Sequence, residues 1–174
     1  MRRRDQACQY VRSAQDAGLF PGRAHEAVAA ASVYAVCRCT GLSRTLDEFA
    51  PVARVPQSQI ISAYKALNTE LGLPTQPITP AAFVPRVANA LDVTDSIRRR
   101  ARTLAIDTSE EWAHSGATPK AVAAACVYTV ARDADGQLTQ ARVATVSGIS
   151  VKTIQTHHQT LRRYRDETAS PNAH

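Results

Sequence analysis

The 174-residue chain has few aromatic side chains and no long hydrophobic run. Aromatic residues make up only 5% of it, while Ala, Arg, Val and Thr are abundant, which indicates one or two compact domains of helical character. No apolar run approaches the roughly 20 residues that a membrane-spanning helix needs. The opening residues, MRRRDQ, lead into no apolar signal region. These absences predict a cytoplasmic protein.

Metal sites and catalytic motifs are also missing from the sequence. The four cysteines, Cys8, Cys37, Cys39 and Cys126, lack the C-x-x-C spacing of a zinc site, so we expect buried thiols rather than metal or redox centres. There is no Ser/His/Asp set, no paired carboxylates and no glycine-rich phosphate loop. We therefore expect no cofactor and no enzymatic activity. The net charge of +6 instead suggests an acidic partner, most commonly a nucleic acid.

The most informative feature is an internal repeat. The sequence AVAAASVYAVCR, which begins at Ala27, returns as AVAAACVYTVAR from Ala121, with nine of twelve positions identical at an offset of 94 residues. The same offset aligns Ile60 with Ile154 and Leu67 with Leu161. Because this period is much longer than that of a solenoid, each copy is expected to be a small globular domain.

Hydrophobic periodicity predicts an all-α fold, with an alanine-rich central helix in each repeat. Thr45, Thr79 and Thr139 are expected helix N-caps, and Glu48 completes a capping box with Thr45. We expect a first repeat over residues 1–73, a linker over 74–79, a second repeat over 80–166 and a tail over 167–174. The expected helices span residues 5–18, 24–39, 45–52, 57–71, 80–91, 94–114 and 119–132, with a final helix-turn-helix pair that begins near residues 139 and 151.

The two repeats are not equivalent at their starts. The helix expected over 80–91 would correspond to residues before Met1, so we expect the first repeat to lack its first helix. An uncovered apolar face costs about 25 cal/mol per Å². We therefore expect the first repeat to be the weaker half, or to need a partner.

Charge also distinguishes the two helix-turn-helix pairs. Residues 136–165 contain no Asp or Glu and carry five cationic side chains, whereas the matching residues 42–71 sum to zero charge. This contrast predicts that only the second pair contacts phosphate. Val151, Ile154, His158 and Leu161 share one helical face, which leaves a polar face for DNA. The candidate DNA-binding residues are Arg142, Lys152, Thr153, Gln155, Thr156, Gln159, Arg162 and Arg163.

Plainer interpretations exist for several of these residues. A polar face with Lys and Gln is typical of any surface helix. The absence of Asp and Glu from residues 136–165 is what favours DNA binding as the interpretation. His158 is expected to pack on the core and His157 to face solvent or phosphate, with no metal role. The run Arg98–Arg100, with Arg102, is interpreted as a solvated cationic surface in preference to a second phosphate contact.

Three segments carry a resemblance to a known family: RTLDEFAPVARV from Arg44, FVPRVANALDV from Phe83 and SGATPKAVAAACVYTVA from Ser115. Together they resemble the core domain of archaeal transcription initiation factor B, of the TFIIB family, over about residues 5–165. The resemblance implies two cyclin-like repeats. It also implies binding to a TATA-binding protein seated on promoter DNA, and a second-repeat helix-turn-helix that reads the element upstream of the TATA box.

By that resemblance the helix from Val151 is the recognition helix, and its base-contacting positions fall on Lys152 and Gln155, beside Thr153 and Thr156. Relatives commonly carry V-T-[IV]-R-x-[RS]-Y here, so Gln155 stands in the place of an arginine and His158 in the place of a tyrosine. Because Gln pairs well with adenine and Arg with guanine, we expect a preference distinct from the usual upstream element.

The resemblance leaves two further interpretations open. The family's zinc ribbon does not match any part of this chain, so polymerase is an expected partner only of a longer form, and a short form would occupy promoters as a competitor or repressor. A cyclin-like module could instead bind a protein partner and use its basic face only for solubility. We expect a monomer, and the sequence assigns no residues to the TATA-binding protein contact.

Overall fold

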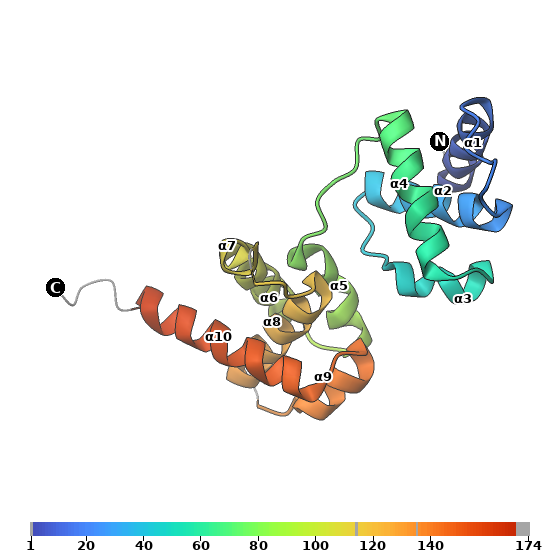
Figure 1. The fold of residues 1–174 in the computed structure, drawn as a ribbon. Helices are drawn as coiled ribbons and strands as arrows, with labels where there is room; N and C mark the ends of the chain where they lie inside the picture. Colours follow the sequence, from blue (N-terminus) through green and yellow to red (C-terminus); the bar gives the residue numbers. More distant parts are fainter. Residues whose placement is uncertain (1, 114, 135, 170–174) are drawn as a thin grey trace. The chain divides into compact units, whose positions relative to one another are not determined.

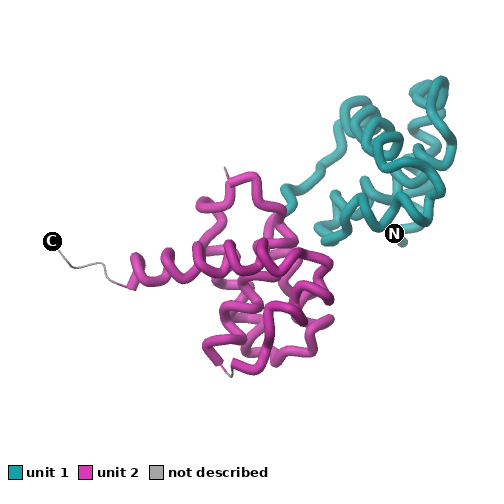
Figure 2. Tube along the Cα trace, turned by 60° about the horizontal axis from the view of Figure 1, so that its bottom comes forward, with its two compact units in different colours: residues 1–78 teal, residues 79–174 magenta. Residues whose placement is uncertain are grey.

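The computed structural model describes residues 2–113, 115–134 and 136–169, and within these ranges every regular element is a helix. The chain divides into two compact units, residues 1–78 and residues 79–174 (Figure 2). The helices are labelled in Figure 1. Unit 1 holds α1 (Arg3–Asp16), α2 (His25–Cys39), the 3-10 turn η1 (Leu46–Glu48), α3 (Ala50–Ala53) and α4 (Gln57–Leu71). Unit 2 holds α5 (Pro80–Ala90), α6 (Asp95–Asp107), α7 (Ser109–Ala113), α8 (Pro119–Ala134), α9 (Gln140–Ser147) and α10 (Val151–Ala169).

The core of unit 1 lies where α2 meets α1 and α4. Its fully buried members include Val28, Ile60 and Leu67, and alanines fill the space between them. Tyr34 of α2 meets the rings of Phe49 and Tyr64 edge to face, with centroids 5.6 and 4.9 Å away. Such pairs add to the energy of area burial. A few aromatic rings thus close a core built mostly from small side chains.

The core of unit 2 is organised around α8, which packs against α5, α6, α9 and α10. All residues from Ala121 to Ala131 are buried. The density of alanine explains this burial, because a small side chain on every face lets neighbouring helices approach closely. The expectation of a central alanine-rich helix is confirmed for α8. In α2 one face stays open, and Val33 remains 45% exposed.

The offset of 94 residues carries α1 onto α6, α2 onto α8, α3 onto α9 and α4 onto α10. No described helix of unit 1 corresponds to α5. The tandem all-helical fold is therefore confirmed. The segment after α4 returns to α2, where Arg38 Nη2 donates to the Gln76 carbonyl at 2.8 Å.

Several helix ends differ from the expectations. The helix expected over 94–114 ends at Asp107, where Thr108 takes the C-cap position with φ −94° and ψ 11°, and α7 follows as a separate short helix. His114 lies outside the described residues. Thr79 occupies the N-cap position of α5 but makes no side-chain capping bond. Helix α10 continues to Ala169, into the expected tail, whose residues 170–174 lie outside the described ranges.

Candidate nucleic-acid interface

The helix pair α9 and α10 is anchored to unit 2 by apolar side chains. Val143 of α9 and Ile154 and Leu161 of α10 are completely buried, and both helices pack on α8. The spacing of Ile154 and Leu161, seven residues apart, places them on one side of α10. The opposite side of α10 is therefore held facing away from the unit.

Hydrogen bonds at the helix ends fix the turn between α9 and α10. Thr139 Oγ1 accepts from the Arg142 N–H at 3.2 Å, which confirms the expected N-cap. Helix α9 ends at Gly148, whose φ of +66° is readily adopted only without a Cβ. Ser150 then caps α10, since its Oγ accepts from the Thr153 N–H at 3.1 Å. Ser150 is not among the N-caps expected from the sequence, although a serine just before an apolar helical pattern is a capping signal.

Most of the candidate DNA-binding residues on α10 are exposed and share its outer face. These are Lys152, Gln155, Thr156, Gln159, Arg162 and Arg163. Two threonines are already engaged. The half-buried Thr153 hydroxyl bonds to Ser150 Oγ at 2.8 Å and helps to hold the turn, and the Thr156 hydroxyl donates to the Lys152 carbonyl at 3.0 Å. This leaves Lys152 and Gln155 as the longest polar side chains at the start of the helix.

Val151 does not join the buried stripe and is 43% exposed, so the expectation that it shares the buried face of Ile154 and Leu161 is wrong. Helical side chains lean toward the N-terminus. At the first residue of α10 the side chain therefore points past the end of the helix.

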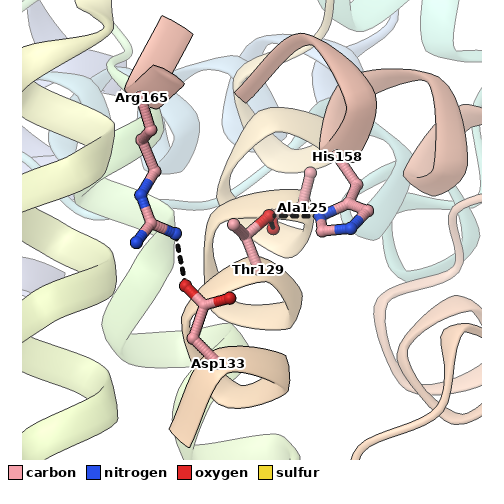
Figure 3. Close-up of polar contacts among 5 residues, drawn as sticks. All are labelled: Ala125, Thr129, Asp133, His158 and Arg165. Atoms are coloured by element: carbon pink, nitrogen blue, oxygen red, sulfur yellow. Dashed lines mark hydrogen bonds and ion pairs between the residues drawn. The ribbon is translucent and has the colours of Figure 1, made fainter. Parts of the chain in front are cut away.

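Two of the five cations counted between residues 136 and 165 meet carboxylates that lie outside that stretch. Arg165 Nη1 pairs with Asp133 Oδ2 of α8, as Figure 3 shows, and Arg163 Nε lies 3.9 Å from Glu167 Oε1. The second pair is exposed and weak. The positive charge of the helix-turn-helix is therefore lower than the sequence count, and the acid-free part of α10 is its N-terminal half.

Arg142, on α9, is exposed and makes one long hydrogen bond to the backbone of unit 2. Its Nη2 donates to the Leu91 carbonyl, just after α5, at 3.4 Å. The long distance makes this a weak bond. The remaining guanidinium donors of Arg142 are available for a phosphate.

Lys120 is a cation of this surface that the sequence analysis missed. It lies in the first turn of α8, and its Nζ is 3.8 Å from the position a Cβ would take on Gly148, in the turn before α10. A signal was available, because the offset of 94 residues carries Lys120 onto Glu26. The charge contrast between the repeats thus extends beyond residues 136–165.

The two histidines of α10 face the unit rather than the outside. The His157 ring meets Trp112 edge to face with centroids 4.9 Å apart, and burial lowers the pKa of His157. This contradicts the expectation that His157 faces solvent or phosphate. His158 is half-buried against Tyr128 and Thr129 of α8, which confirms its expected packing role.

Figure 3 shows how His158 is held. The Thr129 hydroxyl donates to the Ala125 carbonyl at 2.7 Å, so its oxygen accepts from His158 Nδ1 at 2.9 Å. This network assigns the proton of the neutral ring to Nδ1. Burial lowers the pKa of His158, and the neighbouring Arg162 lowers it further. Both histidines therefore favour the neutral state.

The arginine run of α6 divides into a structural residue and a solvated group. Arg98 pairs with Asp95 at 2.8 Å and donates to Asn89 Oδ1 at 3.4 Å. Arg99, Arg100 and Arg102 are exposed. This arrangement fits the solvated-surface interpretation.

The cysteines are reduced thiols in different environments. Cys37 and Cys126 are buried as expected, and burial raises the pKa of Cys126 to about 12. Cys8 is exposed and Cys39 half-buried, so the expectation of buried thiols is wrong for these two. In the part of the chain that the structure describes, no three His, Cys, Asp or Glu side chains are placed to hold a metal ion. No helix in the described ranges is long and apolar enough to cross a membrane.

The fold and the exposed face together define a protein of two tandem helical repeats, the second of which ends in the helix pair α9 and α10 with a cationic outer face. The family model for the transcription factor TFIIB repeat matches residues 3–70 and 74–164. The chain belongs to the TFIIB family.

Named relatives come from halophilic archaea, among others. The chain is 47% identical to transcription initiation factor IIB 5 of Halobacterium salinarum over 158 residues, which cover 91% of this chain and 52% of the relative. It is 44% identical to factor IIB 1 of the same organism over 91% of the chain and 55% of the relative. It is 38% identical to factor IIB 2 of Haloferax volcanii over 95% of the chain and 50% of the relative. The chain spans about half the length of these relatives, all of which are named as transcription factors rather than enzymes.

Proposed function

We propose that this chain is the promoter-binding core of a transcription initiation factor, and that α10 inserts into the major groove upstream of a TATA box while α9 crosses the DNA backbone. The observation that carries the proposal is the acid-free outer face at the start of α10, where Lys152 and Gln155 are exposed and a capped turn fixes their direction. In helix-turn-helix proteins the N-terminal residues of the second helix contact base edges.

Within this interface the residues take different roles. Gln155 offers the donor and acceptor pair that matches adenine N6 and N7, and Lys152 offers a donor for guanine O6 or N7. Lys120, beside the turn, and Arg142, near the start of α9, would contact phosphates, which position the protein without reading sequence. Thr153 supports the turn through Ser150. A preference distinct from the usual upstream element follows from Gln155.

The partner in this proposal is a TATA-binding protein already seated on promoter DNA. Its support is membership of the TFIIB family and the similarity to relatives named as transcription initiation factors. No described residue is assigned to that contact. The separate units, each with its own core, suit a factor that contacts DNA with one repeat and a protein partner with another surface.

A gel shift tests the proposal, on TATA-containing promoter DNA with and without the cognate TATA-binding protein over a salt series. We expect a slower-migrating complex only when both proteins are present, and an apparent affinity that falls steeply with salt. Lys65, exposed on α4 of unit 1, is a matched control, because Lys65→Ala removes the same charge from the equivalent helix. A folded chain that never joins the complex would contradict the proposal.

A further inference from the structure

One contact between the central and the last helix recurs in both units. In unit 1 the ring of Tyr34 on α2 meets the ring of Tyr64 on α4, with centroids 4.9 Å apart and planes at 76°. In unit 2 the ring of Tyr128 on α8 meets the ring of His158 on α10, also at 4.9 Å and at 77°. The offset of 94 residues carries each ring of the first pair onto a ring of the second. The duplicated fold thus keeps the shape of this contact.

Unit 2 adds a hydrogen bond beside the two rings. Thr129 has no exposed surface, and neither has its counterpart in unit 1, Ala35. The Thr129 hydroxyl accepts from His158 Nδ1 at 2.9 Å (Figure 3). Ala35 has no side-chain donor or acceptor, so the bond belongs to unit 2. Both partners of the bond therefore differ between the repeats, while the rings beside them keep their arrangement.

The acceptor of this bond is held rigidly. Thr129 lies in the stretch of α8 that is buried throughout, from Ala121 to Ala131. The single proton of its hydroxyl is donated to the Ala125 carbonyl at 2.7 Å. The oxygen can therefore only accept from the histidine, and its lone pair has a fixed direction. Helix α10 is thus bonded to a fixed point on α8.

The bond is made at the border between the buried and the outer face of α10. With 3.6 residues per turn, His158 lies about 40° around the helix from Ile154 and about 60° in the opposite direction from Gln155. Ile154 is completely buried and Gln155 is exposed. The direction of Gln155 therefore depends on how α10 is rotated about its own axis where His158 is bonded.

A hydrogen bond fixes this rotation more closely than apolar packing does. The burial of Ile154 and Leu161 stabilises the contact without a preferred direction, whereas a hydrogen bond weakens steeply at angles below about 120°. A rotation of about 10° moves an atom at the ~6 Å outer radius of a helix by about 1 Å. Binding side chains must be held to within about 0.5 Å of their working positions. The bond therefore acts on the scale that base recognition requires.

We propose that Thr129 and His158 are positioning residues, which set the rotation of α10 and thereby the direction in which Gln155 meets a base. Thr129 is completely buried, and His158 Nδ1 is directed to it. They act through Gln155, so this role rests on the proposed function. Loss of the bond lowers the discrimination between DNA sequences more than it lowers the affinity for phosphates.

Three variants separate positioning from stability. Thr129→Val keeps the branched shape, removes the hydroxyl and leaves the His158 N–H without its acceptor. Thr129→Ser keeps the hydroxyl and is the conservative rescue. Val84→Ala is the matched control, because Val84 is completely buried on α5, which packs against α8, so that its loss destabilises unit 2 from another helix. Circular dichroism checks that all three remain helical.

A spectroscopic measurement tests the bond without DNA. Nitrogen-15 NMR at neutral pH distinguishes a ring protonated on Nδ1 from one protonated on Nε2, and His158→Asn assigns the signal. We expect His158 to carry its proton on Nδ1 in the wild-type chain and in Thr129→Ser. Thr129→Val should shift the proton toward Nε2. A wild-type His158 that is protonated on Nε2 would overturn the inference.

Gel shifts with the TATA-binding protein then compare two DNAs. One is the promoter that the wild-type chain selects, and the other has the bases upstream of its TATA box scrambled. We expect Thr129→Val to lower the ratio of the two affinities at least about fivefold. Its affinity for the scrambled promoter should stay within about twofold, because phosphate contacts carry no sequence information. Thr129→Ser should restore the ratio, and Val84→Ala should leave it unchanged.

The outcomes distinguish this role from the proposed function. If the wild-type chain discriminates between the two DNAs and Thr129→Val does so equally well, the positioning role is wrong and the reading of DNA by α10 stands. An equal fall in the ratio for Thr129→Val and Val84→Ala would also overturn the positioning role, since the bond would then only stabilise unit 2. Equal affinities of the wild-type chain for the two DNAs would contradict the proposed function and this role with it.

Discussion

Helices α2 and α8 are close to identical over twelve residues, yet only α8 is covered on every side. Val127 of α8 has no exposed surface, whereas its counterpart Val33 in α2 is 45% exposed. The difference arises outside the two helices, because α5 packs on α8 and no described helix of unit 1 corresponds to α5. The burial of a helical face therefore depends on the neighbouring helices, and helices of closely similar sequence can differ in how much of their surface is exposed.

A second comparison concerns the last helix of each repeat. Helices α4 and α10 share the buried anchors Ile60 and Ile154, and Leu67 and Leu161. Their outer faces differ in charge, and Gln155 in α10 stands where α4 has Ile61. The duplication has kept the core positions that hold the fold and changed the surface positions that define a partner.

The largest expected effect is on the free energy of unfolding when the corresponding valines, Val127 and Val33, are replaced. Val127→Asp buries a charge with no partner and should cost about 4 kcal/mol or more of unfolding free energy, whereas Val33→Asp should cost about 1 kcal/mol or less. Urea titration checks this, with Trp112, the only tryptophan, reporting on unit 2. Equal losses would mean that the α2 face is covered in solution.

Substitutions that overpack the two alanine-rich helices should also destabilise unit 2 more than unit 1, by a smaller loss of unfolding free energy than the valine substitutions. Ala124→Leu, at a completely buried site, should cost roughly 1 to 3 kcal/mol. The counterpart Ala30 is half-buried, so Ala30→Leu should cost less. Thermal unfolding followed by circular dichroism compares them, and a larger loss for Ala30→Leu would contradict the packing described for α2.

The charge contrast should appear in DNA affinity. Lys152→Ala is expected to weaken promoter binding by roughly 1 to 3 kcal/mol if the side chain reaches a base. Lys65→Ala in unit 1 should leave it unchanged. Arg163→Ala should weaken DNA binding by an amount between these two. Loss of a free phosphate contact lowers the salt dependence of binding by a slope of roughly one. We expect a smaller change for Arg163→Ala, because Arg163 Nε already lies 3.9 Å from Glu167 Oε1. The ranking is read from gel shifts over a salt series, and a dominant effect of Lys65→Ala would reverse the assignment.

The smallest expected effect is a pH dependence confined to unit 2. Burial lowers the pKa of His157 and of His158 in the folded chain, so the unfolded chain binds more protons below its histidine pKa of about 6.5. Stability is therefore fully present above that value and falls as pH drops through it. Unfolding followed by Trp112 at pH 7.5 and 5.5 should show the loss, and His158→Asn should reduce it. The exposed His25 is the control, and a His25→Asn effect of equal size would contradict this origin.

Sequence patterns predicted the repeat, most helices and the outer face of α10, because periodicity, glycines and caps act locally. The division between α6 and α7 at Thr108 was not predicted, since no glycine or proline marks it in the sequence. The ion pair of Arg165 with Asp133 and the placement of Lys120 beside Gly148 join residues 28 to 32 positions apart in sequence, and only the packing of α8 against α9 and α10 brings them together. His157 was placed on the wrong side for the same reason, since Trp112 lies on another element.

The most direct test of the account is a binding-site selection with the chain and its TATA-binding protein, run in parallel with Gln155→Ala. We expect the wild-type chain to select a site distinct from the usual upstream element, with adenine favoured at one position, and Gln155→Ala to lose that preference while keeping the rest of the site. If both proteins select the same site, α10 does not read DNA through Gln155, and the assignment of this face as the recognition surface is wrong.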